Sequence, residues 1–478
     1  MSLSLASVVI LAAGLGTRMK SATPKVLHEV CGAPILSHVL AATSDVAPAR
    51  TIVVLGHGHE LVRPILPEGV EVALQESQRG TGDALLAADA AFAAPWADGA
   101  MGDAILVVPG DTPLITGEVL LGLVEAHAAS GADATVLTMN LPDPTGYGRV
   151  LRDPDGLVTR IVEQRDASPA ELAVTEVNTG MYVLPGRRAL EILRGLGTDN
   201  AQGELYLTDV VAGLRAAGAR VGAHVTGDPR VTLGVNSRVE LAEVQGVMRA
   251  RILRQWMLAG VSIDDPGSTH VDVGVTLEAD TRLLPGTCLR GTTSVAVGSV
   301  IGPHSTLIDT VVGRGCTVRH SYAEGATLAA GATVGPFSYL RPEARLMEGA
   351  KAGAFVEVKK STIGAGSKVP HLSYIGDATI GAGTNVGAGN ITANYDGRRK
   401  HRTVIGDGVK TGSDTVFVAP VTVGDGATIG AGSIITKDVP AGALGIARAS
   451  QRNITGYDQR HAAAGAADAP AGKDDDGD

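Results

Sequence analysis

Up to about residue 230, short apolar runs alternate with helical patterns. The runs SVVILAA, TIVVLG, AILVVPGD and ATVLTMN are rich in β-branched residues, as buried strands of a parallel sheet are. A helical pattern, EVLLGLVEAHAA, follows the third run. The alternation predicts an α/β domain. The first run also resembles the apolar core of a signal peptide, but no basic segment precedes it, so we expect a buried first strand.

A longer helical pattern follows in NSRVELAEVQGVMRARILRQWMLAG. Ser237 and Glu240 have the spacing of a capping box, which satisfies free backbone N–H groups at the start of a helix. We therefore expect one long linker helix with an apolar stripe formed by Leu241, Val244, Met248, Ile252 and Trp256.

After Asp264 the spacing of the apolar residues changes to six. The residues are Val271, Leu277, Leu283, Leu289, Val295, Ile301, Leu307, then Tyr322, Leu328, Val334, Leu340, Leu346, and finally Phe417, Val423, Ile429 and Ile435. This period predicts a parallel β-helix with one inward-pointing side chain per repeat. Two stretches break the pattern, FVEVKKSTIGAGSKVPHLSY and NITANYDGRRKHRT, and we expect the second to leave the β-helix as a loop.

The composition narrows the possible functions. The 478 residues carry a net charge of −10, which gives no global basic surface for nucleic acid. Cys31, Cys288 and Cys316 are too sparse for a disulfide framework or a zinc site and favour a reducing compartment. No apolar run approaches the roughly 20 residues of a membrane span. We therefore expect a cytoplasmic protein with neither nucleic-acid nor membrane partners.

The loop LAAGLGTRMKSATPK, after the first predicted strand, has the composition of a phosphate-binding site. Gly14 and Gly16 would let the backbone approach a phosphate, and Arg18 and Lys25 would neutralise its charge. The loop lacks the third glycine of a dinucleotide-binding fold and the Gly-Lys-Ser/Thr of a P-loop. Taken alone, a Gly-x-Gly pair is weak evidence for phosphate binding.

Two further segments favour a nucleotide site. Asp111 follows the buried strand in ILVVPGDTPL, where a carboxylate can bind a metal, although a cap or turn residue is also common there. QESQRGTGDA supplies Gln75 and the loop Gly80-Thr81-Gly82, whose backbone could recognise the edge of a base. For this segment a plain turn is the alternative.

Together these motifs resemble those of bacterial bifunctional N-acetylglucosamine-1-phosphate uridyltransferase/glucosamine-1-phosphate acetyltransferases. LAAGLGTRM, GTGDA, GDTPL, PTGYGRV, VEQRDA, EVNTGMY, GELYLTD and GVNSR match in order and spacing, over roughly residues 6 to 455. The resemblance implies a Rossmann-like α/β nucleotidyltransferase domain (1–236), a linker helix (237–262), a left-handed parallel β-helix acetyltransferase domain (263–457) and a disordered tail (458–478). It also implies a homotrimer whose acetyl-transfer sites use residues from adjacent subunits.

The resemblance also implies roles at the first site. UTP would lie on Leu11, Ala12 and Gly14, with Lys25 at its phosphates, Arg18 stabilising the transition state, and Gln75, Gly80 and Thr81 at the uracil. The N-acetylglucosamine would contact Gly148, Glu163 and Asn178. Mg²⁺ would bind Asp111 and Asn236, although Asn236 could also be a simple capping residue. The sugar phosphate would attack the α-phosphorus of UTP, and cations would cancel the repulsion between the two anions.

A second candidate site lies around KVPHLSY. His371 stands in a repeat region that otherwise favours small and aliphatic residues. With an ordinary pKa near ~6.5, a histidine is a suitable base for an attacking amine, although a structural or surface histidine is the common alternative. Arg341, Lys359 and Lys360 could bind a sugar phosphate.

At this second site the resemblance makes His371 the base for acetyl transfer to glucosamine-1-phosphate. Arg341 and Lys359 would bind the phosphate, and Tyr374 and Asn385 the sugar. Acetyl-CoA would lie along Ala388, Asn394, Tyr395, Ser413, Ala431 and Arg448. The implied function is synthesis of UDP-N-acetylglucosamine, a cell-wall precursor, by acetyl transfer followed by uridylyl transfer.

Two departures from the family pattern and two alternative functions remain open. Pro109 stands where family members can carry an aromatic residue, and Ala393 stands where some carry cysteine, so we expect no thiol sensitivity there. The β-helix could be only a scaffold, as in ADP-glucose pyrophosphorylases, but a scaffold needs neither His371 nor Lys359. A non-catalytic assembly protein, like translation-factor subunits with this domain pair, would need no intact first site.

Overall fold

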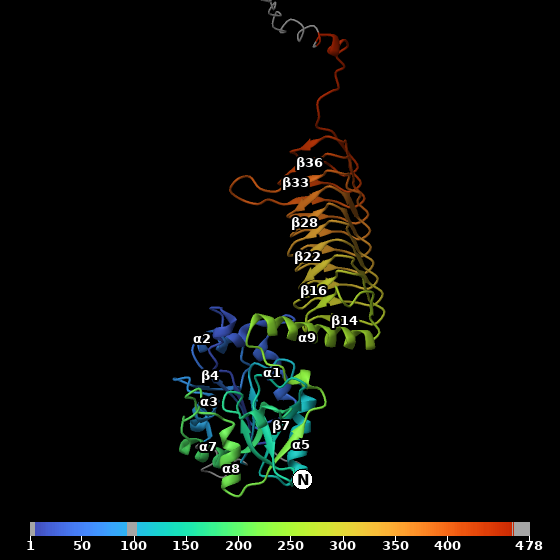
Figure 1. The fold of residues 1–478 in the computed structure, drawn as a ribbon. Coiled ribbons are helices and arrows are strands. Elements are labelled where there is room, and N and C mark those ends of the chain that lie inside the picture. Colours follow the sequence, from blue (N-terminus) through green and yellow to red (C-terminus); the bar gives the residue numbers. More distant parts are fainter. Residues whose placement is uncertain (1–4, 93–102, 461, 463–478) are drawn as a thin grey trace, which may run out of the picture. The chain divides into compact units, whose positions relative to one another are not determined.

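The computed structural model describes residues 5–92, 103–460 and 462. It divides the chain into two compact units, residues 1–310 and 311–478, which are described one at a time. Figure 1 shows the elements of both in chain order. Most of the tail that was predicted to be disordered lies outside the described residues.

The first unit begins with a mixed β-sheet. Its strands are β1 (Ser7–Leu11), β4 (Thr51–Leu55), β5 (Glu71–Leu74), β6 (Ala104–Pro109), β7 (Ala134–Asn140), β8 (Arg149–Arg152), β9 (Val158–Val162), β10 (Glu176–Pro185) and β11 (Val221–Val225). Seven of them follow the order β11-β7-β10-β6-β1-β4-β5, with β8 pairing to β10 and β9. The four predicted strands are all present. Strand β10 runs antiparallel to both β6 and β7, so the sheet is not purely parallel.

Helices cover both faces of this sheet. They are α1 (Ile35–Ser44), α2 (His59–Val62), α3 (Thr81–Ala87), α5 (Gly117–Ser130), α6 (Pro169–Leu172), α7 (Gly186–Gly195) and α8 (Asp209–Ala216). The same region also contains short 3₁₀ helices, which are η1 (Thr17–Met19), η2 (Lys25–Leu27), η3 (Arg63–Ile65) and η4 (Pro229–Thr232). Strands β2 (Glu29–Val30) and β3 (Ala33–Pro34) form a hairpin.

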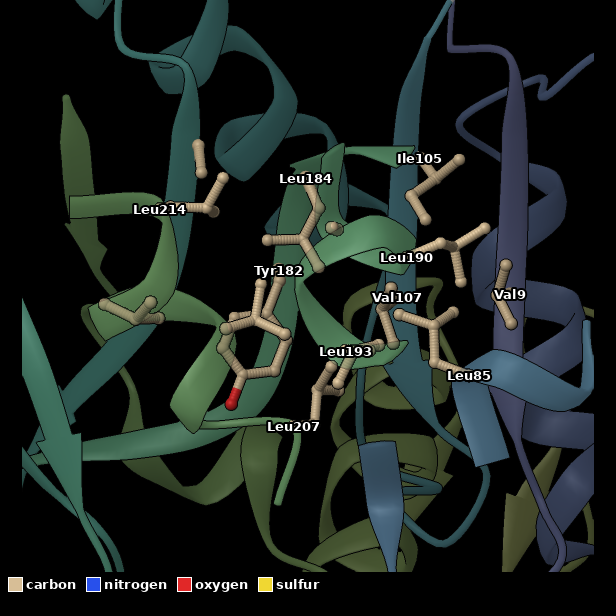
Figure 2. Packing of buried hydrophobic residues seen from close by; sticks show 14 of the residues in the cluster. Val9, Leu85, Ile105, Val107, Tyr182, Leu184, Leu190, Leu193, Leu207 and Leu214 are labelled. Atoms are coloured by element: carbon tan, nitrogen blue, oxygen red, sulfur yellow. The ribbon is translucent and has the colours of Figure 1, made fainter. Parts of the chain in front are cut away.

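The alternation of side chains along the strands creates two hydrophobic cores. Val9 and Val107 point to the face covered by α3, α7 and α8, where Figure 2 shows Leu85 and Leu190 beside them and Leu214 at the other side of the same core. Val8 and Leu106 point to the opposite face, towards α1 and α5. Because both faces are buried, the strands read as continuous apolar runs.

The predicted linker helix is α9 (Arg238–Leu258). The capping box is present: Ser237 Oγ accepts from Glu240 N, and the Glu240 carboxylate accepts from Ser237 N. Leu241, Val244, Met248 and Ile252 are buried as expected, but Leu253 rather than Trp256 completes the stripe, and Trp256 is half-buried.

After α9 the first unit continues as short parallel strands. These are β12 (Ser262–Ile263), β13 (His270–Val271), β14 (Thr276–Leu277), β15 (Arg282–Leu283), β16 (Cys288–Arg290), β17 (Ser294–Val295), β18 (Val300–Ile301) and β19 (Thr306–Ile308). His270 pairs with Cys288, and Cys288 with Thr306, so three hexapeptides make one turn. The seven aliphatic residues predicted between Val271 and Leu307 are all buried.

The second unit continues the same architecture with three parallel sheets. The first contains β21 (Thr317–Val318), β24 (Thr333–Val334), β27 (Lys351–Ala354) and β30 (Lys368–His371), and β35 (Lys410–Thr411), β38 (Thr428–Ile429) and β40 (Leu444–Gly445) form a further short sheet. The second contains β22 (Tyr322–Glu324), β25 (Tyr339–Leu340), β28 (Glu357–Lys359), β31 (Tyr374–Gly376), β33 (Ile391–Ala393), β36 (Val416–Val418) and β39 (Ile434–Ile435). The third contains β20 (Val311–Val312), β23 (Thr327–Leu328), β26 (Arg345–Leu346), β29 (Thr362–Ile363), β32 (Ala378–Ile380), β34 (Thr403–Ile405) and β37 (Val421–Val423).

One detail of the hexapeptide prediction is wrong. Tyr322 is 38% exposed, and its neighbour Ala323 points inward instead. The steps from Val318 to Ala323 and from Ala323 to Leu328 are five residues long, so the six-residue register slips there. The first predicted break, FVEVKKSTIGAGSKVPHLSY, contains a five-residue step from the buried Val358 to the buried Ile363. It stays within the β-helix, because it forms β28, β29 and β30 in regular pairing. The second predicted break is confirmed as a loop between β33 and β34, which projects from the stack (Figure 1).

Candidate active sites

A cleft of about 540 Å³ opens at the carboxyl ends of β1 and β6 in the first unit. Its lining includes, among the residues predicted for the first site, Leu11, Ala12, Gly14, Arg18, Lys25, Gln75, Gly80, Thr81, Asp111, Glu163, Asn178 and Asn236. Gly148 is absent from the lining, but its carbonyl accepts a hydrogen bond of 2.9 Å from Asn178 N. The fold therefore brings together residues spread over more than two hundred positions of the sequence.

The glycines of the opening loop have different roles from each other. A Cβ on Gly14 would meet no atom within 4 Å, so this backbone is open to a ligand. Gly16 has a φ of +61°, and a Cβ there would lie 2.8 Å from Lys25 Cβ. Gly16 therefore allows Lys25 to pack against the loop. The sequence had suggested only that Gly16 lets the backbone approach a phosphate.

Lys25 lies between the two residues predicted to bind a metal. Its Nζ is 2.5 Å from Asp111 Oδ2 and donates a 3.1 Å hydrogen bond to Asn236 Oδ1. A backbone hydrogen bond also holds the two segments together, because Val235 N, next to Asn236, donates to Asp111 O. Glu240 Oε2 accepts from Asn236 N at 2.6 Å, so the cap of α9 also holds Asn236 in place. The two side-chain oxygens converge on one cation.

Gln75 and the Gly80 loop form another part of the cleft. Gln75 Nε2 donates to Gly80 O at 3.1 Å and to Asp83 Oδ2 at 2.8 Å. Its amide oxygen has no hydrogen bond to any residue that the structure describes and is available as an acceptor. Gly80 has a φ of +117°, and a Cβ there would lie 2.5 Å from Leu205 O, so only glycine fits.

Glu163 and Asn178 lie together in a third part of the cleft. A Cβ on Gly148 would be 3.4 Å from Glu163 Oε1, which places all three predicted sugar contacts within one small region. Burial, only partly offset by a hydrogen bond from Thr208, raises the pKa of the Glu163 carboxyl, and the nearby carboxylates Asp209, Asp166 and Glu204 raise it further.

Sequence reasoning missed several residues of the cleft lining: Gln78, Gly180, Tyr182, Glu204 and Thr208. Glu204 and Thr208 belong to GELYLTD, which was recognised as a motif without a role for either residue. Pro109 also lines the cleft and packs against the backbone of Gly180, where a Cβ would lie 3.0 Å from Pro109 Cγ. Tyr182 ends the recognised motif EVNTGMY, but the motif was given no role for it, because Tyr182 reads as one more core residue.

The second site lies entirely in the second unit, along one corner of the β-helix. Backbone hydrogen bonds connect successive turns at this corner: Gly389 N to His371 O, Asp414 N to Ala388 O, and Gly432 N to Ser413 O. Arg448 Nη1 then donates to Ala431 O at 2.8 Å. The predicted base and four predicted acetyl-CoA contacts therefore form one continuous column.

Cationic side chains lie on the adjacent sheet. Arg341 Nη1 donates to Glu357 Oε1 at 3.0 Å, and Glu357 pairs with Tyr374 on the next strand. Lys359 Nζ lies 3.6 Å from Asp377 Oδ2. The same carboxylate oxygen accepts a 2.5 Å hydrogen bond from Asn394 Nδ2.

Lys400 is a further cation of this cluster that the sequence reasoning missed. It belongs to the loop between β33 and β34, and the neighbouring Lys359 ammonium lowers its pKa. The run of basic residues in NYDGRRKHRT was the available signal. Asp377, at a φ of +48°, was also missed, because its sequence gives no sign that it reaches Lys359.

Three predicted residues of the second site make few contacts with the others. The His371 ring is exposed and makes no hydrogen bond to any described residue, and Asn385 lies on the neighbouring sheet, where it pairs with Lys368 and Lys410. Tyr395 is 62% exposed, and its hydroxyl donates to Gly397 O within its own loop.

Comparison with known proteins matches both halves of the chain. Residues 8–216 match the MobA-like NTP transferase domain, and residues 402–437 match the bacterial transferase hexapeptide (six repeats). Bifunctional protein GlmU of Streptomyces coelicolor is 51% identical over 456 residues, covering 95% of this chain and 94% of the relative. GlmU of Kineococcus radiotolerans is 50% identical (95% and 91%), and that of Mycobacterium bovis 47% (95% and 92%).

The chain belongs to the bifunctional GlmU family. The resemblance drawn from the motifs is confirmed, and so is the fold class, a Rossmann-like nucleotidyltransferase domain followed by hexapeptide repeats that form a parallel β-helix. As a GlmU family member the chain is an enzyme in which a uridyltransferase half precedes a hexapeptide acetyltransferase half. None of the helices described in the structure is long and apolar enough to cross a membrane.

Proposed function

We propose that the enzyme makes UDP-N-acetylglucosamine in two steps at the two sites. The second-unit site transfers acetyl from acetyl-CoA to glucosamine-1-phosphate. The cleft of the first unit then transfers uridylyl from UTP to the acetylated sugar phosphate. The observation that supports the proposal best is the gathering of the predicted nucleotide, metal and sugar residues into one cleft.

In the uridylyl transfer, a phosphate oxygen of N-acetylglucosamine-1-phosphate attacks the α-phosphorus of UTP, and pyrophosphate leaves. Arg18 and Lys25 neutralise charge on the phosphates, Gln75 and the Gly80-Thr81 backbone hold the uracil, and Glu163, Asn178 and Gly148 hold the sugar. Catalysis comes from positioning the two substrates and neutralising their phosphate charge, because this reaction needs no protein nucleophile.

Asp111 and Asn236 are suited to a divalent cation, which we take to be Mg²⁺. The Lys25 ammonium between their oxygens shows that this pair can hold a positive charge, and carboxylate and amide oxygens are ligands that Mg²⁺ prefers. The ion, when bound, would supply further neutralisation of phosphate charge.

In the acetyl transfer, the amine of glucosamine-1-phosphate attacks the thioester carbonyl, His371 accepts the amine proton and CoA leaves as the thiol. Arg341, Lys359 and Lys400 attract the phosphate, with Tyr374 and Asn385 at the sugar. Acetyl-CoA lies along the corner column of Ala388, Ser413, Ala431 and Arg448, with Asn394 and Tyr395 beside it.

Three further features belong to this proposal. The His371 ring has no hydrogen-bond partner among the described residues, which fits a homotrimer in which an adjacent subunit completes the site. The three cysteines are free thiols, which fits a cytoplasmic enzyme. We keep the boundaries 1–236, 237–262, 263–457 and 458–478 for the functional segments, although the first compact unit extends to Thr310.

The experiment supplies purified protein with UTP, Mg²⁺ and acetyl-CoA and offers either glucosamine-1-phosphate or its N-acetylated form. We expect wild type to make UDP-N-acetylglucosamine from both sugars, and His371→Ala to make it only from the acetylated one. Wild type using only the acetylated sugar would make the β-helix a scaffold. Reaction of neither sugar would refute the nucleotide or the sugar assignment of the first-unit cleft, because uridylyl transfer forms the detected product in both assays.

A further inference from the structure

Tyr182 connects the hydrophobic core to the sugar region of the cleft. Its ring packs with Leu184, Leu193 and Leu207 in the core, as Figure 2 shows, and the side chain is only 1% exposed. The residue nevertheless lines the cleft, and its hydroxyl accepts a 2.7 Å hydrogen bond from Asn178 Nδ2. A core residue is thus bonded to a predicted sugar-binding residue.

A bulge in β10 makes this contact possible. In a regular strand, residues four positions apart are separated by about 13 Å. The pairing of β10 with β7 shifts register between Asn178 and Tyr182, and Gly180, at a φ of +79°, lies in the irregular segment. Pro109 packs against Gly180 and leaves no room for a larger residue there. The irregular backbone brings the two side chains together.

Two hydrogen bonds fix the orientation of the Asn178 amide. Nδ2 donates to the Tyr182 hydroxyl, and Oδ1 accepts from Gly180 N at 3.1 Å. An asparagine side chain has two N–H donors and two acceptor lone pairs. One donor and one acceptor therefore remain for a ligand, which is the pair of groups that a sugar hydroxyl can satisfy.

We propose that Tyr182 is a positioning residue for uridylyl transfer, acting through Asn178 to orient the amide that holds the sugar. The inference rests on the proposed function of the cleft. Without the hydroxyl, the amide loses one of its two anchors and recognises the sugar less well. The uracil region, formed by Gln75 and the Gly80 loop, does not depend on this bond.

The test is Tyr182→Phe in the full-length chain, because phenylalanine keeps the ring in the core and removes only the hydroxyl. We expect the KM for N-acetylglucosamine-1-phosphate to rise about fivefold, the loss typical of one hydrogen bond. The KM for UTP and kcat should stay near wild type, because the lost binding is equal in ground and transition states. Acetyl transfer by the same molecules reports that the chain is folded.

Tyr206→Phe is the matched control. Tyr206 is also buried, but its hydroxyl bonds to Gln202 and Asp166, which do not line the cleft. Its removal should leave both KM values unchanged. A second control combines Tyr182→Phe with Asn178→Ala: if Tyr182 acts through Asn178, its own effect disappears in that background.

Two results would overturn the inference. One is an equal rise of both KM values in Tyr182→Phe, which would indicate a packing role. The other is an undiminished effect of Tyr182→Phe in the Asn178→Ala background. Failure of the proposed function is a separate result, since wild type would then form no UDP-N-acetylglucosamine at all.

Discussion

The Lys25 ammonium lies 2.5 Å from Asp111 Oδ2. It therefore stands beside the two predicted metal ligands, where a metal ion would place its own positive charge. Lys25 and Asp111 are largely buried, with 11% and 23% of their side-chain surfaces exposed, so the interaction is only weakly screened by solvent. In the protein without nucleotide, a divalent cation must therefore compete with Lys25 for Asp111. UTP would give Lys25 other anionic partners.

This competition predicts that Lys25→Gln binds Mn²⁺ more tightly than wild type in the absence of nucleotide. We expect a gain of about tenfold, because a buried like charge is removed from the site. Mn²⁺ titration followed by electron paramagnetic resonance measures it without turnover. Arg18→Gln is the matched control, because Arg18 lines the same cleft but bonds to neither oxygen, and it should change the affinity little. Equal affinity of Lys25→Gln and wild type would contradict the prediction.

Glu163 predicts a conflict between stability and sugar binding. Burial raises its pKa, so the carboxyl ionises less readily in the folded protein than in the unfolded chain. Below the unfolded pKa of about 4.3 the carboxyl is neutral in both states and costs nothing. As pH rises from the unfolded pKa to the raised folded pKa, the unfolded chain ionises more readily than the buried group, so the fold is destabilised. Glu163→Gln should therefore have a higher melting temperature than wild type at pH 7 and the same melting temperature near pH 3.5. Its sugar binding should be weaker than that of wild type.

A carboxylate with the opposite shift provides the control for this measurement. Bonds from Ser168 lower the pKa of the half-buried Glu171, so its stabilisation is present above pH ~4.3 and is lost as pH falls. Glu171→Gln should therefore have a lower melting temperature than wild type at pH 7. The prediction for Glu163 fails if thermal unfolding of Glu163→Gln shows no pH-dependent difference from wild type.

The residues of both sites differ in how well the sequence could predict them. Lys25, Asp111 and Asn236 carry motif signals, and the hexapeptide period identifies Val271 or Leu283 as inward-pointing without any structure. Tyr182 belongs to the motif EVNTGMY, but the motif does not reveal the contact of its hydroxyl, which depends on a bulge. Asp377 carries no motif signal, because its contact depends on a corner with positive φ. Tyr322 was misplaced because repeats of five and six residues look alike until pairing fixes the register.

Because Ala393 stands where some family members carry cysteine, we expect acetyl transfer to resist thiol reagents. No thiol stands beside Asn394, and Cys316, the single cysteine after residue 310, is buried and donates to Ala329 O. Burial also raises the pKa of Cys316, which lowers the fraction of reactive thiolate. Treatment with N-ethylmaleimide should leave acetyl transfer intact, while Ala393→Cys should become sensitive. Rapid inactivation of wild type would contradict this expectation.

Asp377 predicts a change in the alkaline limb of acetyl transfer. Lys359 lowers the pKa of Lys400, and the Asp377 carboxylate opposes this by favouring the charged form of both lysines. In Asp377→Asn the negative charge opposite the two lysines is lost, but the new amide oxygen can still accept a hydrogen bond from Asn394. Lys400 then loses its proton at lower pH, and less positive charge remains to attract the substrate phosphate.

The expected result is an alkaline limb of kcat/KM for glucosamine-1-phosphate that moves to lower pH in Asp377→Asn. Titration of the substrate amine is common to both proteins, so the difference between their profiles reports the enzyme. Glu343→Gln is the matched control, because Glu343 lies 3.7 Å from Lys360 and belongs to a different ion pair. If both variants keep the wild-type limb, Asp377 does not control the charge of Lys400. If both shift equally, the effect is one of net charge and not of the Lys359–Asp377 contact.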